Sequence, residues 1–67
     1  MRYCYKAERN GKGGFVSCLL SAAWDTQRDA ALAAKLRYNL PLEKFKMLSA
    51  GKPVTHRRVE FSIFVHP

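Results

Sequence analysis

The clearest alternation of apolar and polar residues lies near the C-terminus. Apolar side chains stand at every second position within residues 57–65: Val59, Phe61, Ile63 and Val65. Successive side chains of a strand point to opposite faces, so this spacing predicts a strand with one apolar face and one largely polar face. Branched and aromatic residues, which half-buried strands favour, dominate the segment. We therefore expect residues 57–65 to form the strand on which a small sheet assembles.

Two further extended segments are predicted near the N-terminus. Apolar and polar residues alternate over residues 2–9, whereas residues 15–20 are apolar on both faces, which is typical of a central strand. The loop Asn10–Gly14 contains Asn-Gly and two more glycines, which supply the positive φ angles of a tight hairpin. Its spacing matches no phosphate-binding glycine motif, and it leads into a strand rather than a helix. The sequence therefore predicts a β-hairpin.

A helix is predicted over residues 26–39. Thr26 offers an N-cap oxygen with Asp29 three residues later, and Pro41 ends the helical pattern. The segment is rich in alanine and leucine, which favour helix. One face is predicted to pack on the sheet through Leu32, Ala33, Leu36 and Leu40, widened by Ala30 and Ala34.

Residues 42–50 fit two structures. Phe45 and Met47 alternate with lysines, as in a short strand, while Leu42, Phe45 and Leu48 fit a helical turn. We favour the strand, followed by a turn at residues 51–53. The predicted fold is then a single α+β domain over residues 1–67, with the order ββαββ: a mainly antiparallel sheet of four strands and one helix on one face. A three-stranded sheet is the alternative.

The charge of the chain is unusual for its size. Twelve Lys and Arg residues against five Asp and Glu residues give 67 residues a formal net charge of +7. Such self-repulsion lowers stability, so its presence favours an anionic partner, most often nucleic acid, over a surface that is merely basic. The N-terminus carries no secretory signal, and the apolar run from Phe15 to Trp24 is about half a membrane span. We expect a cytoplasmic protein without a membrane role.

Two sets of residues are predicted to contact partners. The nucleic-acid contacts are expected from basic residues on strand faces and loops: Arg2, Lys6, Lys12, Lys52, Arg57 and Arg58. A second surface, toward a protein partner, is expected from Trp24, Lys44, Lys46 and Phe64. Tyr3 and Tyr5 are either core residues or stacking positions for single-stranded bases. The protein is expected to be a monomer, or a homodimer formed through an edge strand.

No cofactor, metal or catalytic group is predicted. Cys4 and Cys18 lie opposite each other if the hairpin loop centres on Gly11, yet an intracellular chain with two cysteines more often keeps them reduced. Neither cysteine nor histidine shows the spacing of a zinc site. A small endoribonuclease would use His56 with Glu60 or Glu8 as second acid or base. This arrangement is the enzymatic alternative to a binding protein.

The layout resembles that of small phage-encoded inhibitors of host machines, including anti-CRISPR proteins. The resemblance rests on the acidic and hydroxyl cap followed by alanine-rich turns at residues 25–33. The first hairpin, with Tyr3, Tyr5, Glu8 and Gly13–Val16, is similar to that of HicB-like antitoxins, although their Pro-Asp-Leu-Pro-Gly segment is missing. From the net charge of +7 we expect a non-enzymatic binding module that docks its cationic surface on nucleic acid or a nucleoprotein machine, as a regulator or inhibitor. The alternative is an inhibitor that binds an acidic protein surface.

Overall fold

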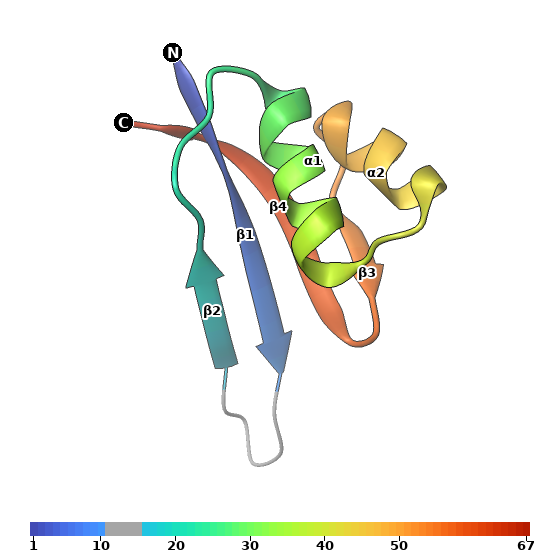
Figure 1. Ribbon diagram of the computed structural model, residues 1–67. Coiled ribbons are helices and arrows are strands. Elements are labelled where there is room, and N and C mark those ends of the chain that lie inside the picture. Colours follow the sequence, from blue (N-terminus) through green and yellow to red (C-terminus); the bar gives the residue numbers. More distant parts are fainter. Residues whose placement is uncertain (11–15) are drawn as a thin grey trace.

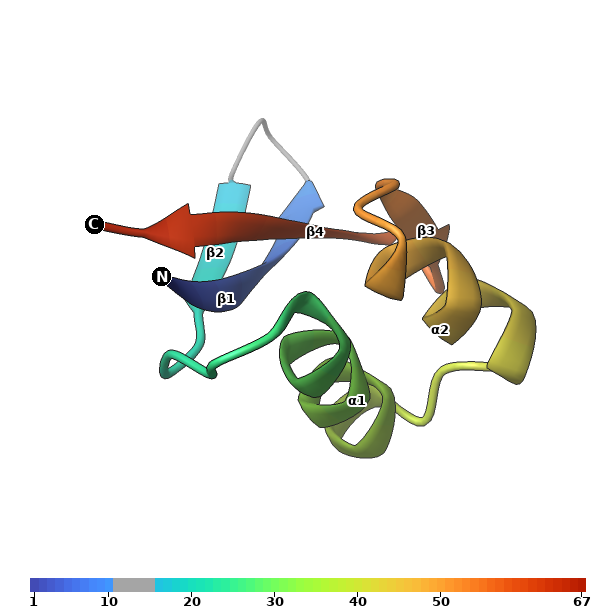
Figure 2. The ribbon, with the colours of Figure 1, turned by 90° about the horizontal axis from the view of Figure 1, so that it is seen from above.

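Four antiparallel strands form one sheet, and two helices pack on one of its faces (Figures 1 and 2). The computed structural model describes residues 1–10 and 16–67. The elements in chain order are β1 (Arg2–Asn10), β2 (Val16–Leu20), α1 (Gln27–Tyr38), α2 (Leu42–Ser49), β3 (Val54–His56) and β4 (Val59–His66). The α+β class and the four-stranded sheet are confirmed, but the described residues form two helices where the sequence predicted one.

The longest strand pairing joins the two ends of the chain. β1 pairs with β4 over eight residue pairs, from Arg2 opposite His66 to Arg9 opposite Val59. Both termini therefore lie at the same end of the sheet (Figure 1). Tyr5 and Phe61, on one face of this pair, are buried beneath the helices. The apolar face predicted from the C-terminal alternation is thus the face that carries the core.

The predicted N-terminal hairpin is present, but its second strand is at the edge of the sheet. β2 pairs only with β1 in the strand order β2-β1-β4-β3. The expectation of a central strand was therefore wrong. Neither helix packs on β2, so Leu19 stays exposed on the helix side, and Leu20 is exposed on the opposite face of the sheet. The predicted turn glycines and Lys12 lie outside the described residues.

Helix α1 begins and ends close to the predicted residues. The Asp29 N–H donates to Thr26 Oγ1 over 3.0 Å, and Asn39 adopts the left-handed conformation (φ 54°) just after the helix. The face that packs on the sheet consists of alanines, namely Ala30, Ala31 and Ala34. Small residues on the helix accommodate the aromatic side chains that rise from β1 and β4.

The predicted leucine face of α1 was in part wrong. Leu32 is 37% exposed and Leu36 is 73% exposed, whereas Leu40, beyond the helix end, is buried. α1 is rotated about its own axis so that its alanines, rather than its leucines, face the sheet. Bulky Tyr5, Tyr38 and Phe61 already fill the space under α1, so only an alanine surface can approach the sheet closely.

Residues 42–49 form α2 rather than the predicted strand. Pro41 precedes the helix, a position where its fixed φ and missing N–H are tolerated. Phe45 and Leu48 point into the core, and Met47 is 44% exposed. The spacing of three between the buried residues is that of a helix. Of the alternating lysines that suggested a strand, Lys46 is exposed, whereas Lys44 contacts β3.

The C-terminal strand β4 is the second strand of a hairpin that the sequence pattern did not indicate. β3 comprises Val54–His56 and pairs with β4, so that Arg57 and Arg58 form the turn between them. The predicted strand at residues 57–65 therefore begins two residues too early. The turn was missed because it contains neither glycine, asparagine nor proline, the residues that normally mark one.

One apolar cluster between the sheet and the helices holds the fold together. Phe61 and Leu48 are among its most buried side chains. Tyr38 packs edge-to-face on Phe61 with 4.8 Å between ring centroids. The cluster consists of Tyr5, Ala7, Ala31, Ala34, Leu40, Phe45, Leu48, Val54 and Phe61. A domain of this size has little stability to lose, so each large member matters.

Replacing neighbouring residues of α2 will distinguish the helix from the predicted strand. Leu48→Ala should lower the free energy of unfolding by about 2–5 kcal/mol, because it removes a fully buried side chain. Met47→Ala, on the exposed side, should change it by less than about 0.5 kcal/mol. Urea denaturation followed by circular dichroism measures both. Equal losses for the two variants would contradict the helical placement.

Candidate functional site

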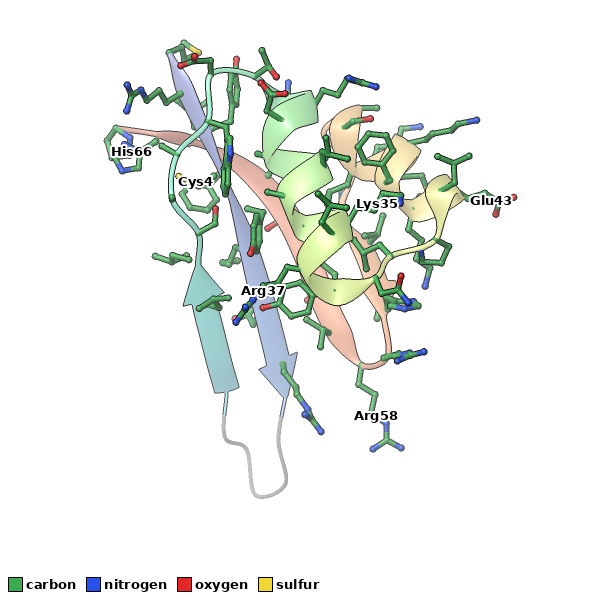
Figure 3. All side chains as sticks on the ribbon, in the orientation of Figure 1. Cys4, Lys35, Arg37, Glu43, Arg58 and His66 are labelled. Atoms are coloured by element: carbon green, nitrogen blue, oxygen red, sulfur yellow. The ribbon has the colours of Figure 1, made fainter. Side chains whose placement is uncertain are left out.

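The turn between β3 and β4 consists of two arginines in an unfavourable backbone conformation. Arg57 has φ 51° and Arg58 has φ 67°. Positive φ at both central residues is typical of a two-residue hairpin turn that usually contains Asn-Gly. For other residues this conformation costs roughly 1–2 kcal/mol each. Both side chains are exposed, and Arg58 projects from the end of the hairpin (Figure 3).

Lys44 from α2 joins this turn to the helix layer. Its Nζ donates to the Thr55 carbonyl oxygen and lies 3.3 Å from His56 Nδ1. Because an ammonium group only donates, Nδ1 acts as the acceptor, and the ring proton then resides on Nε2. Lys44 was predicted to belong to a separate surface toward a protein partner. The structure instead places it beside His56 and the two arginines.

The pKa of His56 is lowered from its ordinary value of 6.5. Loss of hydration of the half-buried ring is the main cause, followed by the positive charges of Lys44 and Arg57. The imidazole is therefore neutral at pH 7, which agrees with the contact from Lys44. His56 thus acts as a neutral hydrogen-bonding group within a positively charged surface.

Arg9 completes the basic surface at this end of the sheet. It pairs with Val59 across β1 and β4, and Val59 pairs with His56 across β4 and β3. These three residues therefore form one row on the helix side of the sheet. We name the following residues the basic hairpin cluster: Arg9, Lys44, His56, Arg57 and Arg58. Sequence reasoning missed Arg9, although its odd position, shared with Tyr3 and Tyr5, places it on this side.

The cations of the cluster form no salt bridge within the described part of the chain. The salt bridges among the described residues join Arg2 to Asp25, with 3.9 Å between charged atoms, and Lys6 to Glu8, with 4.0 Å. Neither includes a member of the cluster. Glu43, next to Lys44 in the sequence, points away from the hairpin (Figure 3). An anion approaching this surface would therefore meet cations that are not already paired.

The face of the sheet opposite the helices, here called the open face, is not the purely cationic surface that was predicted. Arg2 and Lys6 lie on it, but so do Glu8 and Glu60, which stand directly opposite each other on β1 and β4. Arg2 is roughly 23 Å along β1 from the level of the Arg57–Arg58 turn. The predicted nucleic-acid contacts are therefore separated into two groups, and the open face carries both signs of charge.

The other predicted contact residues lie apart from the cluster. Lys52 is exposed at the start of β3, at the opposite end from the turn, and Lys46 is exposed on α2. Lys12 falls outside the described residues. Phe64 is half-buried on the open face, opposite Cys4. These positions do not form one continuous surface with the turn.

Tyr5 belongs to the core and Trp24 packs against it, whereas Tyr3 is half-buried and lies outside the core cluster. Tyr5 is 5% exposed and stacks on Trp24, with 6.0 Å between ring centroids. Burial is the main cause of a raised pKa for Tyr5. Trp24 is half-buried, and its backbone pairs with Tyr3. Tyr5 is thus covered by the helix layer and is not available to stack on bases.

The two cysteines are free and far apart. Cys18 pairs with Glu8 rather than with Cys4, because the register of β1 and β2 differs from the expected one. Cys4 is buried, and Cys18 is exposed. Within the described residues, no three His, Cys, Asp or Glu side chains are placed to hold a metal ion. No helix of the described chain is long and apolar enough to cross a membrane.

The structure separates the residues that a ribonuclease would need together. His56 lies on the helix side of the sheet, in the row with Val59. Glu60 and Glu8 are one position out of phase with that row and lie on the open face. His66 is at the far end of β4. General acid–base catalysis requires both groups within reach of one reacting phosphate. His56 therefore lies on the opposite side of the sheet from both carboxylates.

Comparison with protein-family models, curated proteins and solved structures finds no match to this chain.

Replacing the turn will show whether the two arginines strain the hairpin. Arg57→Asn combined with Arg58→Gly should raise the free energy of unfolding by about 1 kcal/mol, because both residues accept positive φ. In a domain of this size the melting temperature should rise by about 4–8 °C. Arg57→Lys with Arg58→Lys keeps the charges and should bring no gain. A similar gain in both variants would show that side-chain chemistry, not backbone conformation, limits stability.

The lowered pKa of His56 makes stability depend on pH. Below about pH 6.5 the unfolded chain binds a proton at His56 that the folded protein resists, so stability should fall as the pH drops through this value. His56→Gln should remove this part of the pH dependence, while His66→Gln should keep it. Melting temperatures recorded between about pH 5 and pH 8 provide the measurement. A profile unchanged by His56→Gln would be contrary evidence.

Proposed function

We propose that the protein is a non-enzymatic binding module that docks the basic hairpin cluster on the phosphate backbone of nucleic acid. The observation that carries the proposal is the turn formed by Arg57 and Arg58. Both are exposed, both have positive φ, and neither is in a salt bridge with a described carboxylate. Strained residues of this kind are concentrated at functional sites.

Arginine at the turn suits phosphate recognition. Each guanidinium presents a planar set of donors that binds phosphate oxygens in pairs. The turn holds the two arginines next to each other at the end of the hairpin, where a backbone can pass without meeting the helices (Figure 3). A turn of Asn-Gly would be more stable but would lack both charges. Function therefore accounts for the choice of residues better than stability does.

Lys44 and His56 support the arginines from the helix side. The Lys44 bond to the Thr55 carbonyl fixes the ammonium group beside the turn. The neutral His56 ring adds an Nε2–H donor and no positive charge to those of Lys44, Arg57 and Arg58. A bound phosphate would favour protonation of His56, so affinity should increase as the pH falls toward 6. Arg9 extends the same positive surface toward β1.

The net charge of +7 favours nucleic acid over an acidic protein patch. When many cations of a protein bind a polyanion, the release of its counterions favours binding, whereas protein interfaces rely on buried aromatic anchors. Trp24, the best candidate for such an anchor, packs on Tyr5 within the fold. A domain of 67 residues that covers a stretch of nucleic acid, or a nucleoprotein machine bound to it, would act as a regulator or inhibitor.

Removing the two arginines should weaken binding more than removing two other cations. With Arg57→Ser and Arg58→Ser, we expect the log–log salt slope for duplex DNA to fall by about 1.8, because each phosphate that is no longer neutralised lowers the slope by about 0.9. Affinity should fall at least about tenfold at low salt. Fluorescence anisotropy with a labelled duplex and a labelled single strand measures both quantities.

The control removes the same charge elsewhere. Arg2→Ser with Lys6→Ser leaves the cluster intact, so the slope should stay close to that of the natural protein. Equal losses in the two double variants would indicate a diffuse field rather than a local site. An affinity that does not change between about 50 mM and about 300 mM salt would exclude nucleic acid as the direct partner and favour an acidic protein surface.

A further inference from the structure

Strand β2 lacks the cover that the other strands have. It contains five residues, Val16–Leu20, none of them charged, in a chain with a net charge of +7. Helix α1 packs on β1 and β4, and α2 packs on β3 and β4. β2 lies beyond α1, at the edge of the sheet (Figures 1 and 2). Leu20 is 60% exposed on the open face, and Leu19 is 42% exposed on the helix side.

The backbone of β2 presents hydrogen-bonding groups to solvent. The Ser21 N–H donates to the Tyr5 carbonyl over 3.1 Å, so Ser21 faces β1. Along an antiparallel strand, the backbone N–H and C=O groups of successive residues point alternately toward one neighbouring strand and away from it. The backbone groups of Leu19 therefore also point toward β1, while those of Cys18 and Leu20 point outward. Among the hydrogen bonds of the described residues, none satisfies these outward groups.

The opposite edge of the sheet is protected. β3 is three residues long and follows Pro53, which has no N–H to donate. The one carbonyl that β3 directs outward, that of Thr55, accepts from Lys44 Nζ. Short strands, prolines and lysines are the means by which proteins block edge pairing. The same sheet therefore has one edge closed to pairing and one edge left open.

We propose that β2 pairs with β2 of a second copy of the chain, in antiparallel orientation about a two-fold axis at Cys18. An identical strand is the occupant that this edge fits, because antiparallel pairing of β2 with itself is self-complementary. In this register Cys18 lies opposite Cys18 of the second copy, and the outward groups of Val16 lie opposite those of Leu20. Three such pairs form about six backbone hydrogen bonds.

Electrostatics and packing agree with this register. Two chains of +7 repel each other, so they should associate where charge is lowest, and no charged residue lies within β2. The nearest charges on the open face, Lys6 and Glu8, have opposite signs. Pairing also covers Leu20, which the monomer leaves exposed. Pairing of two copies through β2 does not depend on nucleic-acid binding.

Sedimentation of nuclease-treated, reduced protein tests the proposal. We expect twice the chain mass at micromolar concentrations. Cys18→Pro removes an outward N–H without breaking a bond to β1, so it should raise the dimer dissociation constant at least about tenfold while circular dichroism stays unchanged. Thr55→Pro removes the outward N–H of the other edge and should leave the dimer intact. A monomer at every concentration, or a dimer lost equally in both variants, would overturn the proposal.

A disulfide across the axis tests the register. Opposed residues of a hydrogen-bonded pair have Cα atoms about 5.5 Å apart, within the range that a disulfide spans. Diamide, which accepts the two electrons and two protons released by two thiols, should convert the natural protein and Cys4→Ser into covalent dimers. Cys18→Ser should remain non-covalent. A dimer that diamide does not link through Cys18 would exclude this register, and linkage through Cys4 would exclude the edge pairing altogether.

Discussion

The pairing of β1 with β4 is the constraint on which the rest of the structure depends. It joins the first and last strands of the chain and builds the apolar surface that both helices cover. Aromatic side chains on this surface, among them Tyr5 and Phe61, leave room only for small residues on α1. The alanine face of the helix therefore follows from the bulk of the strands. Once this layer is packed, the chain from β2 to β3 crosses one face of the sheet as the two helices.

The basic hairpin cluster is a consequence of that arrangement. β4 runs to the end of β1, and the chain reaches it from α2 through a short hairpin whose turn must lie at the end of the sheet. In this turn Arg57 and Arg58 form no salt bridge with a described carboxylate. The same arrangement brings Lys44 of α2 next to His56. Charges that are distant in sequence thus gather at one end, with a backbone conformation that reduces stability.

The two edges of the sheet have different properties for a related reason. Lys44 connects α2 to β3, and by doing so it both closes one edge and completes the basic surface. β2 has no helix beside it and no charged residue within it. A small domain with one thin core cannot cover every strand of a four-stranded sheet. β2 is the strand left uncovered, with Leu19 and Leu20 exposed.

Local patterns were sufficient for much of the fold. The alternation in β1 and β4, the hairpin, and the limits of α1 were all predicted from period, caps and turn residues, because these depend on neighbours in the sequence. The α2 segment was predicted incorrectly because eight residues satisfy both a strand and a helix pattern, and only packing of Phe45 and Leu48 against the core selects the helix. The turn at Arg57 and Arg58 was missed because its residues argue against a turn.

The candidate site shows the same division. From the residues alone it follows that the protein is strongly basic and that Arg57 and Arg58 are adjacent to His56. Which cations lie together depends on the packing of the chain: Arg9 and Lys44 join the arginines, and Arg2 and Lys6 lie among carboxylates. The physical reason is that charge interactions depend on distance in space, and strand order sets those distances only after the whole chain has packed.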